Sequence, residues 1–254
     1  MFEMDGNIEI MKENYIVSER KGQKMAKKNH IAIVLAAGKG RRMHSDIQKQ
    51  YLPIHGKPVL FYSLNVLEQC PFIEEIVLVT GEGEERYCED EIVKRYHFQK
   101  VKKIVCGGRE RYHSVYAGIQ AVGQCDYLYI HDGARPFLTM EILERGRKAA
   151  QEYGSCAVGM PVKDTIKIAD ETGFVISTPP REKLWMIQTP QIFEYNLIRE
   201  AYEKLMCSNQ EGITDDAMVV ETMMGKKVKL VEGSYQNIKI TTPEDLRIAE
   251  IFSK

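Results

Sequence analysis

The strongest structural signal in this chain is the segment Ile31-Ala32-Ile33-Val34-Leu35-Ala36-Ala37-Gly38-Lys39-Gly40-Arg41-Arg42-Met43. A short apolar run followed by glycines is typical of a buried strand whose exit loop brings backbone N–H groups close to phosphate oxygens. The two arginines would add cationic side chains beside the same oxygens. The segment therefore predicts phosphate recognition at the carboxyl end of a strand.

Two familiar phosphate loops do not fit this segment. The P-loop requires a glycine, four intervening residues and then Gly-Lys-Ser/Thr, and counting from Gly38 that pattern fails. The dinucleotide-binding pattern requires a third glycine where this chain has Met43, which disfavours an ordinary dehydrogenase. A short Gly-X-Gly also occurs by chance, in which case Gly38 and Gly40 only form a tight turn and the arginines are solvated. The loop alone leaves that alternative open.

The composition indicates a protein with a sizeable core and nearly balanced charge. Its 254 residues are 44% hydrophobic and carry a formal net charge of −1. Such a surface offers no basic footprint for nucleic acid or an anionic membrane, so we expect a small-molecule ligand. The six cysteines are far apart and form no Cys-X-X-Cys pair, which favours a reducing, cytoplasmic location. No apolar run approaches the ~20 residues that span a bilayer.

Residues 1–29 are expected to precede the folded domain. They mix Glu, Lys and Asn with scattered Ile and Met, and they contain no signal-peptide apolar region. We interpret them as a disordered extension, with a short amphipathic helix lined by Ile8, Met11, Tyr15 and Ile16 as the alternative. Residues 30–254 are then a single domain.

From residue 30 onward, short β-rich runs alternate with segments of helical periodicity. The expected strands cover residues 30–36, 76–80, 101–105, 126–131, 156–161, 228–232 and 237–241. The expected helices cover residues 58–69, 85–97, 111–122, 139–152, 194–206, 214–224 and 243–252. Strands separated by helix-length segments predict βαβ units and a mainly parallel sheet with helices on both faces. Ligands of such folds gather at the carboxyl ends of the strands, where the Gly38 loop lies.

One segment departs from this alternation. Residues 163–188 contain two β-rich runs around Asp170-Glu171-Thr172-Gly173, which predicts a β-hairpin. A two-stranded ribbon is only marginally stable in water, so it should pack on another surface. A partner subunit is the natural candidate, and the chain's own domain is the alternative.

Two further loops follow expected strands at the same edge of the sheet. Gly107 and Gly108 can bring backbone close to a base or a phosphate. Asp132 comes directly after the strand at 126–131, and a carboxylate beside a triphosphate suggests a Mg²⁺ contact. A turn cap paired with Arg135 is an equal alternative for this carboxylate.

Lys239 stands between apolar neighbours near the end of the chain. A lysine in that setting is less comfortable on a solvated face than one in a charge run, so an anionic partner is favoured. A lysine at a strand edge is the alternative.

Eight segments stand in a fixed order along residues 30–254: LAAGKGRRM, KQYL, GGRERYHS, HDGARP, PVKDT, TPPREKLWMIQTPQIF, TDDA and NIKIT. With these segments the chain resembles the 2-C-methyl-D-erythritol 4-phosphate cytidylyltransferase family of the non-mevalonate isoprenoid pathway. The resemblance implies an α/β, Rossmann-like nucleotidyltransferase fold with a mainly parallel sheet and a protruding β-arm at about 163–188. It also implies an enzyme that uses CTP and Mg²⁺ to transfer CMP to 2-C-methyl-D-erythritol 4-phosphate, releasing pyrophosphate. The family's homodimer uses the arm to complete the partner's active site.

The resemblance assigns roles position by position. It implies that Arg42 and Lys49 act on the α-phosphate and the pyrophosphate, and that Lys239 is a further catalytic cation that holds the acceptor phosphate. The residues that it places around CTP are Ala36, Ala37, Gly38, Gly40, Arg41, Gly107, Gly108, Arg109 and Ser114. The residues that it places at the methylerythritol phosphate are Asp132, Arg135, Thr165, Arg181 and Thr189, with Asp132 also near the metal. It implies that three of them, Thr165, Arg181 and Thr189, act across the dimer.

The chain departs from the family pattern at three positions. Arg109 stands where the family commonly has an acidic residue, so we expect backbone groups to contact cytosine there. Gln48 replaces the usual proline before Lys49, and Gly133 replaces alanine. None of these changes removes a predicted catalytic charge.

The implied chemistry needs positive charge rather than a general base. The second pKa of a phosphate monoester is about 6, so the acceptor phosphate is largely dianionic at neutral pH. Two anions must then approach each other, and positioned cations relieve their repulsion.

Three other functions are alternatives to this one. Ribitol 5-phosphate cytidylyltransferases tend to carry Leu-Ala-Gly-Gly where this chain has Leu35-Ala36-Ala37-Gly38, and sugar-1-phosphate nucleotidyltransferases should differ in the downstream motifs. A catalytically silent nucleotide-binding module on the same fold is the non-enzymatic alternative.

Overall fold

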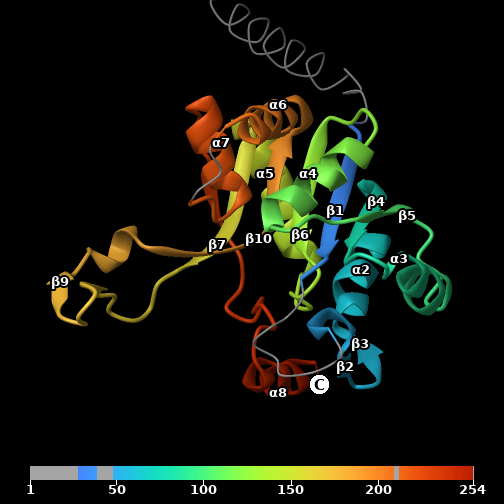
Figure 1. Ribbon diagram of the computed structural model, residues 1–254, viewed down its shortest axis with the longest axis horizontal. Coiled ribbons are helices and arrows are strands. Elements are labelled where there is room, and N and C mark those ends of the chain that lie inside the picture. Colours follow the sequence, from blue (N-terminus) through green and yellow to red (C-terminus); the bar gives the residue numbers. More distant parts are fainter. Residues whose placement is uncertain (1–27, 39–47, 209–211, 254) are drawn as a thin grey trace, which may run out of the picture.

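A computed structural model of the chain describes residues 28–38, 48–208 and 212–253. Its centre is a seven-stranded sheet in the order β11-β7-β10-β6-β1-β4-β5, with helices on both faces (Figure 1). Strand β10 runs antiparallel to both of its neighbours, whereas the other neighbouring pairs in this sheet are parallel. The predicted mainly parallel α/β fold is therefore confirmed.

The strands of this sheet are β1 (His30–Ala36), β4 (Ile73–Thr80), β5 (Val101–Cys106), β6 (Tyr127–Asp132), β7 (Ser155–Pro161), β10 (Trp185–Glu194) and β11 (Lys229–Glu232). Two short ribbons pair β2 (Pro53–Ile54) with β3 (Lys57–Pro58) and β8 (Ile168–Ala169) with β9 (Val175–Ser177). The α-helices are α2 (Val59–Gln69), α3 (Glu85–Tyr87), α4 (Arg111–Ala121), α5 (Met140–Tyr153), α6 (Tyr195–Met206), α7 (Asp216–Met224) and α8 (Pro243–Phe252). Two 3₁₀ turns, η2 (Lys49–Tyr51) and η4 (Arg181–Lys183), and a π-helical turn, η3 (Cys88–Lys94), complete the described elements.

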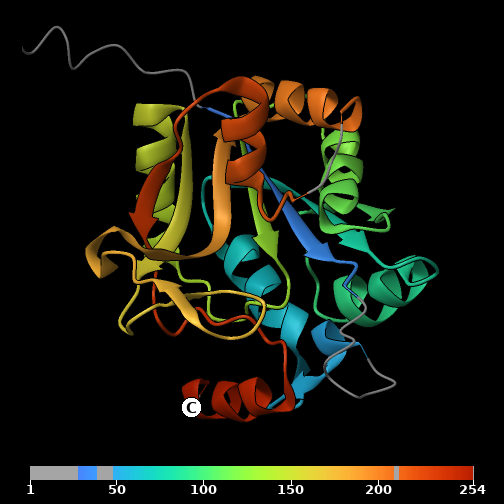
Figure 2. The same ribbon diagram turned by 60° about the vertical axis from the view of Figure 1, so that its left-hand side comes forward.

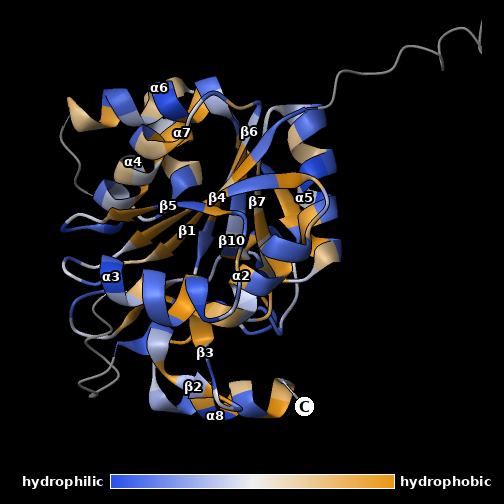
Figure 3. Ribbon diagram, turned by 90° about the vertical axis from the view of Figure 1, so that its right-hand side faces the viewer, coloured by the Kyte–Doolittle hydropathy of each residue, from blue (hydrophilic) through white to orange (hydrophobic). Residues whose placement is uncertain are grey.

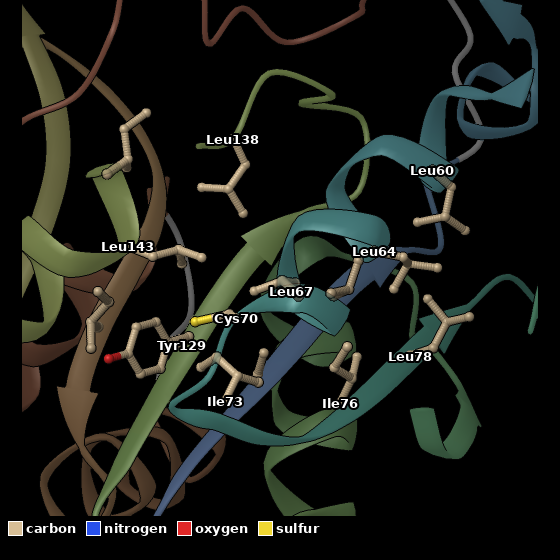
Figure 4. Packing of buried hydrophobic residues seen from close by; sticks show 14 of the residues in the cluster. Leu60, Leu64, Leu67, Cys70, Ile73, Ile76, Leu78, Tyr129, Leu138 and Leu143 are labelled. Carbon is tan, nitrogen blue, oxygen red and sulfur yellow. The ribbon is translucent and has the colours of Figure 1, made fainter. Parts of the chain in front are cut away.

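The sheet is buried on both faces because alternate residues of its strands enter different cores. In β1, Ala32 and Val34 pack on the side of α2 and α5, whereas Ile31 and Ile33 pack on the side of α4, α6 and α7. Figure 4 shows the first core, in which Leu60 and Leu64 of α2 lie over β4. In Figure 3 the strands of the central sheet are coloured mainly as hydrophobic residues, as expected for a sheet that packs against helices on both faces.

A third, smaller core lies near the carboxyl edge of the sheet. There Ile54 of β2 and Val59 of α2 pack with Ile240 and with Ala249 of α8. Helix α8 accordingly lies beside the β2–β3 ribbon in both Figure 1 and Figure 2. This core fixes the segment that precedes α8.

Most predicted elements agree with the structure to within a few residues, and β1 and α8 agree at both ends. The predicted strand at 237–241 is wrong, because in the described structure this segment is an extended loop outside the sheet. Its apolar residue Ile240 enters the third core, and its N–H donates to the carbonyl of Ala134 at 2.8 Å. The helix predicted at 85–97 is present over residues 85–94, but α3 passes into the π-helical turn η3 and the helix ends three residues early.

Strand β10 was not predicted. It contains Pro190, and a proline argues against a strand in the middle of a sheet. The structure accommodates it with a shift in the β7–β10 register between Ile187 and Gln191. The sequence around Pro190 does not reveal that a strand can form there, because the register shift depends on the position of β7.

The arm leaves the sheet between β7 and β10 and projects from the body of the protein (Figures 1 and 2). Its ladder is limited to β8 and β9, so the paired region is shorter than predicted. The turn is fixed by Asp170, whose Oδ1 accepts from the N–H groups of Thr172 and Phe174 at 2.9 and 3.0 Å. Gly173 adopts a φ of +89°, which suits glycine there.

The predicted extension falls largely on residues 1–27, which lie outside the described residues. Asn29 already belongs to the fold, because its N–H donates to Asp126 Oδ2 at 2.7 Å. Along the described part of the chain, the helices are too short or too polar to cross a bilayer.

Candidate active site

A pocket of about 860 Å³ opens at the carboxyl edge of β1, β4, β5 and β6. The predicted site residues that line it are Ala37, Gly38, Lys49, Gly107, Gly108, Arg109, Ser114, Asp132 and Lys239. These residues come from loops that are far apart in the sequence. The topology of a parallel sheet therefore assembles them at one edge, as predicted.

The exit of β1 forms one wall of this pocket. Ala36 is the buried last residue of β1, and Ala37 and Gly38 continue into the pocket wall. The predicted residues Gly40, Arg41 and Arg42 lie outside the described residues.

The turn that carries Lys49 is fastened at two points. The side chain of the buried Gln50 donates to the carbonyl of Ala36 and, at 2.5 Å, to Oε1 of Gln48. The hydroxyl of Tyr51 donates to Glu84 Oε2 at 2.7 Å. Gln48, which stands where the family has proline, thus helps to hold Gln50 against the end of β1. Lys49 lines the pocket, and the two residues that follow it in the turn, Gln50 and Tyr51, are held by these hydrogen bonds.

The glycine pair after β5 allows a close approach of two loops. A Cβ on Gly107 would stand 2.6 Å from Cβ of Ala37 and 2.7 Å from Oγ of Ser114, so no larger residue fits. The Ser114 hydroxyl accepts from the N–H of Gly108 at 3.1 Å. The Arg109 side chain is 92% exposed at the rim, which is compatible with base contact through the backbone.

Asp132, the last residue of β6, is the centre of the charged groups in the pocket. Its Oδ2 lies 2.7 Å from Lys239 Nζ and 3.8 Å from Arg135 Nε, and its Oδ1 lies 3.3 Å from Arg111 Nε. Burial opposes ionisation of this carboxyl, but the positive charges of Arg111, Lys239 and Arg135 outweigh it and hold its pKa well below its usual range. Asp132 is therefore ionised throughout the physiological pH range.

The Arg135 guanidinium is largely buried against main-chain carbonyls. It donates to the carbonyl of Asn237 at 2.8 Å and to that of Ile187 at 3.4 Å. Arg135 therefore joins the Lys239 loop to β10. Its ion pair with Asp132 agrees with the turn-cap alternative, and its predicted contact with substrate stays a prediction.

Thr189, which was expected to act across the dimer with Thr165 and Arg181, instead lies behind Asp132 of its own chain and is not in the wall of the pocket. Its Oγ1 accepts from the Asp132 N–H at 3.0 Å and lies 3.0 Å from His131 Nδ1. Burial lowers the pKa of His131 to about 4, so the ring is neutral near pH 7. Because His131 Nε2 lies 3.3 Å from the carbonyl of Arg135, we assign the proton to Nε2, and Thr189 then donates to Nδ1.

Thr165 and Arg181 lie on the arm and are exposed. Arg181 Nη1 donates to the carbonyl of Lys163 at 3.0 Å. Neither residue is among the described residues that line the pocket of their own chain. The structure brings Lys49, Asp132 and Lys239 together but does not bring these two arm residues to them.

Two residues near the pocket were not predicted. Arg111 begins α4 and lines the pocket, and the fully buried Asp216 begins α7 and binds Arg111 from behind. A signal for Asp216 existed in the sequence. It precedes the apolar residues Ala217, Val219 and Val220 of an expected helix, and a carboxylate on a buried helix face needs a cationic partner.

Comparison with known proteins identifies the family. The profile of the 2-C-methyl-D-erythritol 4-phosphate cytidylyltransferase family matches residues 30–254. The chain belongs to this family. A cytidylyltransferase of this name from Clostridium kluyveri is 51% identical over 223 residues, which cover 88% of this chain and 96% of the relative. One from Caldanaerobacter subterraneus is 51% identical over 227 residues, covering 88% and 98%.

Solved structures of the cytidylyltransferase family share the fold. The crystal structure of 4-diphosphocytidyl-2C-methyl-D-erythritol synthase from Anaerococcus prevotii superposes with a TM-score of 0.79 at 34% identity, covering 89% of this chain and 96% of that chain. That of the cytidylyltransferase from Thermus thermophilus gives a TM-score of 0.71 at 28% identity, covering 87% and 97%. The Rossmann-like nucleotidyltransferase fold with its arm is thereby confirmed.

Asp132 is the pocket carboxylate that the resemblance places near Mg²⁺. Among the described residues, no three His, Cys, Asp or Glu side chains form a cluster that could cage a metal. Mg²⁺ is commonly held by one or two carboxylates together with substrate phosphates and water, however. Asp132 fits the part of the single carboxylate, because it is ionised and the contact of its Oδ1 with Arg111 Nε, at 3.3 Å, is longer than that of its Oδ2 with Lys239.

Proposed function

We propose that this protein transfers the cytidylyl group of CTP to 2-C-methyl-D-erythritol 4-phosphate in the pocket described above. The products are 4-diphosphocytidyl-2-C-methyl-D-erythritol, an intermediate in isoprenoid precursor biosynthesis, and pyrophosphate. The observation that carries this proposal is the convergence of Lys49, Asp132 and Lys239 in one pocket beside the Gly107 loop, in a chain of this family.

CTP would occupy the side of the pocket formed by β1 and β5. The base would lie against Gly107 and Gly108, where the absence of side chains lets backbone groups approach a flat ring. The triphosphate would extend toward Gly38 and Lys49. Ala36, Gly40, Arg41 and Arg42 belong to the same proposal, which the geometry of Ala37 and Gly38 supports.

The acceptor phosphate would approach from the side of Lys239. One of its oxygens forms a bond to the α-phosphorus of CTP, while the bond from that phosphorus to the oxygen bridging to the β-phosphorus breaks. Pyrophosphate leaves with the bond electrons. Because the acceptor is already largely dianionic, no proton has to be removed. Lys49 and Lys239 stabilise the charge that develops on the phosphate oxygens.

Asp132 is the residue that would hold Mg²⁺ together with the nucleotide phosphates. When bound there, the ion supplies positive charge against the triphosphate and aligns its α-phosphorus. Asp132 also holds Lys239 in the pocket through their 2.7 Å contact.

A homodimer belongs to the same proposal. The arm exposes Ile168, Phe174, Val175 and Ile176, with 49%, 74%, 59% and 65% of their surfaces accessible. A short ribbon with so much apolar surface requires a second surface to pack on. A second copy of the chain would provide it and would receive Thr165 and Arg181 at its own pocket, where Arg135 and Thr189 would support Asp132.

The proposed location is the cytoplasm. All six cysteines lie in the described part of the chain, and all are free thiols, four of them at least partly buried. Unpaired thiols suit a reducing compartment.

The test is an incubation of the purified chain with CTP, Mg²⁺ and single polyol phosphates. Pyrophosphate release and the mass of the nucleotide product should identify 2-C-methyl-D-erythritol 4-phosphate as the preferred acceptor. Ribitol 5-phosphate and a sugar 1-phosphate serve as the competing substrates. Preference for either competitor, or CTP binding without pyrophosphate release, would refute the proposal.

A further inference from the structure

Arg111 connects the pocket to a carboxylate that lies behind it. Its Nη1 and Nη2 atoms each donate to one oxygen of Asp216 at 2.8 Å. Its Nε donates to Asp132 Oδ1 at 3.3 Å. One guanidinium is therefore shared between a carboxylate in the pocket and a carboxylate outside it.

Asp216 itself has no access to the pocket. It is 0% exposed and is not among the described residues that line the cavity. The hydroxyl of Tyr202 in α6 donates to its Oδ1 at 2.6 Å, so both carboxylate oxygens are engaged. Such an arrangement fixes the plane of the Arg111 guanidinium from behind.

We propose that Asp216 is a positioning residue for the transfer reaction, acting through Arg111 on Asp132. An arginine prefers to bind a carboxylate or phosphate with two parallel hydrogen bonds. Asp216 takes these paired hydrogen bonds from the two terminal nitrogens of Arg111, and the contact of Arg111 with Asp132 is a longer one through Nε. The other oxygen of Asp132 has Lys239 Nζ as its near neighbour at 2.7 Å, with Arg135 Nε farther away at 3.8 Å.

Loss of Asp216 would change the arrangement inside the pocket. The freed guanidinium would turn its terminal nitrogens toward Asp132 or toward a phosphate of the nucleotide. Either contact would displace Lys239 from the position that the proposed function requires. This inference therefore rests on the proposed function.

The start of α7 is held in place by contacts other than the Asp216–Arg111 pair. Asp215 caps the helix by accepting from the N–H of Met218 at 2.9 Å. The Gln191 side chain donates to Asp215 and accepts from the N–H of Ala217, at 2.9 and 2.8 Å. The contact between Asp216 and Arg111 is thus additional to what holds the helix on the sheet.

The test compares steady-state kinetics of full-length Asp216→Asn with those of the parent. A displacement of catalytic groups by about 1 Å can cost about 10²-fold in rate, so we expect kcat to fall about 10- to 100-fold. The KM for CTP should change less than about threefold, because Asp216 touches no substrate. The charge-retaining Asp216→Glu should recover part of the lost kcat. The control is Glu203→Gln, which removes an exposed carboxylate from an arginine pair one residue from Tyr202 and should leave kcat unchanged.

A second comparison separates positioning from a structural role. Arg111→Lys keeps the charge but lacks the paired donors, and we expect it to lose at least about tenfold in kcat. Adding Asp216→Asn to Arg111→Lys should then cost less than about threefold more, since the shared contact is already gone.

The proposal is overturned if folded Asp216→Asn keeps its kcat within threefold of the parent, or if the two losses multiply in the double variant. If Asp216→Asn does not fold, Arg111→Lys decides, and turnover equal to the parent's overturns the proposal. A parent protein that does not turn over 2-C-methyl-D-erythritol 4-phosphate would instead refute the proposed function.

Discussion

The ammonium of Lys239 lies 2.7 Å from Oδ2 of Asp132, although one residue comes from a loop and the other from the end of β6. The loop is fixed on the other side, because Ile240 is buried in the third core. Lys239 is thus directed into the pocket, with 35% of its side chain exposed, while its neighbour is anchored away from the pocket. The pairing places a positive charge where two anionic substrates would meet.

Replacement of Lys239 by alanine should therefore reduce turnover without unfolding the protein. Loss of a preorganised charge in the transition state typically costs about 10²- to 10³-fold in kcat. The measurement is pyrophosphate release at saturating substrates, with thermal unfolding as the check on folding. Lys229→Ala is the matched control, because Lys229 is exposed on β11 and outside the pocket. Similar turnover in both variants would remove Lys239 from the mechanism.

Lys49→Ala should also fold and lose most of its turnover. The turn that carries Lys49 is held by Gln50 and Tyr51, so removal of the lysine side chain leaves its anchors in place. We expect a kcat loss of about 10²- to 10³-fold with a thermal midpoint close to that of the parent. Circular dichroism and the pyrophosphate assay measure the two effects. A variant that is both folded and fully active would show that Lys49 is not a catalytic residue.

Gly133 should resist conversion to the alanine that is usual in the family. A Cβ at this position would stand 2.7 Å from Cδ1 of Leu60 and 3.0 Å from the carbonyl oxygen of Leu35. Overpacking of a closed core typically costs about 1–3 kcal/mol, so Gly133→Ala should lower the unfolding free energy by about that amount. Urea denaturation measures it. Leu60→Val shortens the clashing side chain, so the double variant should lose less than the sum of the single losses. Strict additivity would contradict the predicted clash.

The fold was largely predictable because its signals are local. The β1 run and the Leu60, Leu64 and Leu67 stripe bury the residues that their periodicity predicts. Two strand assignments failed for reasons that involve distant segments. Pro190 in β10 is tolerated through its partner strand, and the apolar residues around Lys239 pack on α8 and β2 rather than in the sheet.

The site was predictable to the extent that parallel strands deliver their loops to one edge. This rule brought Gly38, Gly107 and Asp132 together. The rule does not predict which charged side chains form ion pairs with one another. The Arg111–Asp216 pair joins residues 105 positions apart, and such a contact depends on how α4 and α7 pack on the same face of the sheet.

The stability of the protein should decrease as the pH falls from about 6.5 to about 4. The pKa of His131 is about 4 in the folded state because the ring is buried, whereas the ordinary value of a histidine is 6.5. Between these values the unfolded chain binds a proton that the folded chain does not, so lowering the pH favours unfolding. The full effect of one such histidine is about 3 kcal/mol, from about 1.4 kcal/mol per unit of pKa.

The check is urea denaturation of the parent and of His131→Gln at pH 7, 6, 5 and 4.5. The variant should be less stable at pH 7 but should lose less stability on acidification. Part of the pH dependence will persist in it, because burial also lowers the pKa of His30 to about 4. Asp132 contributes little to the slope in this window, since the stability from its lowered pKa is lost mainly as the pH falls through its ordinary value of 3.8 and below. Equal slopes in the two proteins would contradict a neutral, buried His131.

The composite site can be tested with mixed dimers of Lys49→Ala and Arg181→Ala. Lys49 lines the pocket of its own chain, whereas Arg181 lies on the arm and is not among the described residues that line it. If the arm serves the partner, one site of each mixed dimer contains both intact residues and the other site contains neither. Two inactive variants should then regain activity on subunit exchange, up to about a quarter of the parent activity for random pairing in a two-fold dimer. Two different affinity tags, pulled down in succession, isolate the mixed species. If that isolated species is inactive, the arm completes the site of its own subunit, since each chain would then carry a defect that its partner cannot supply.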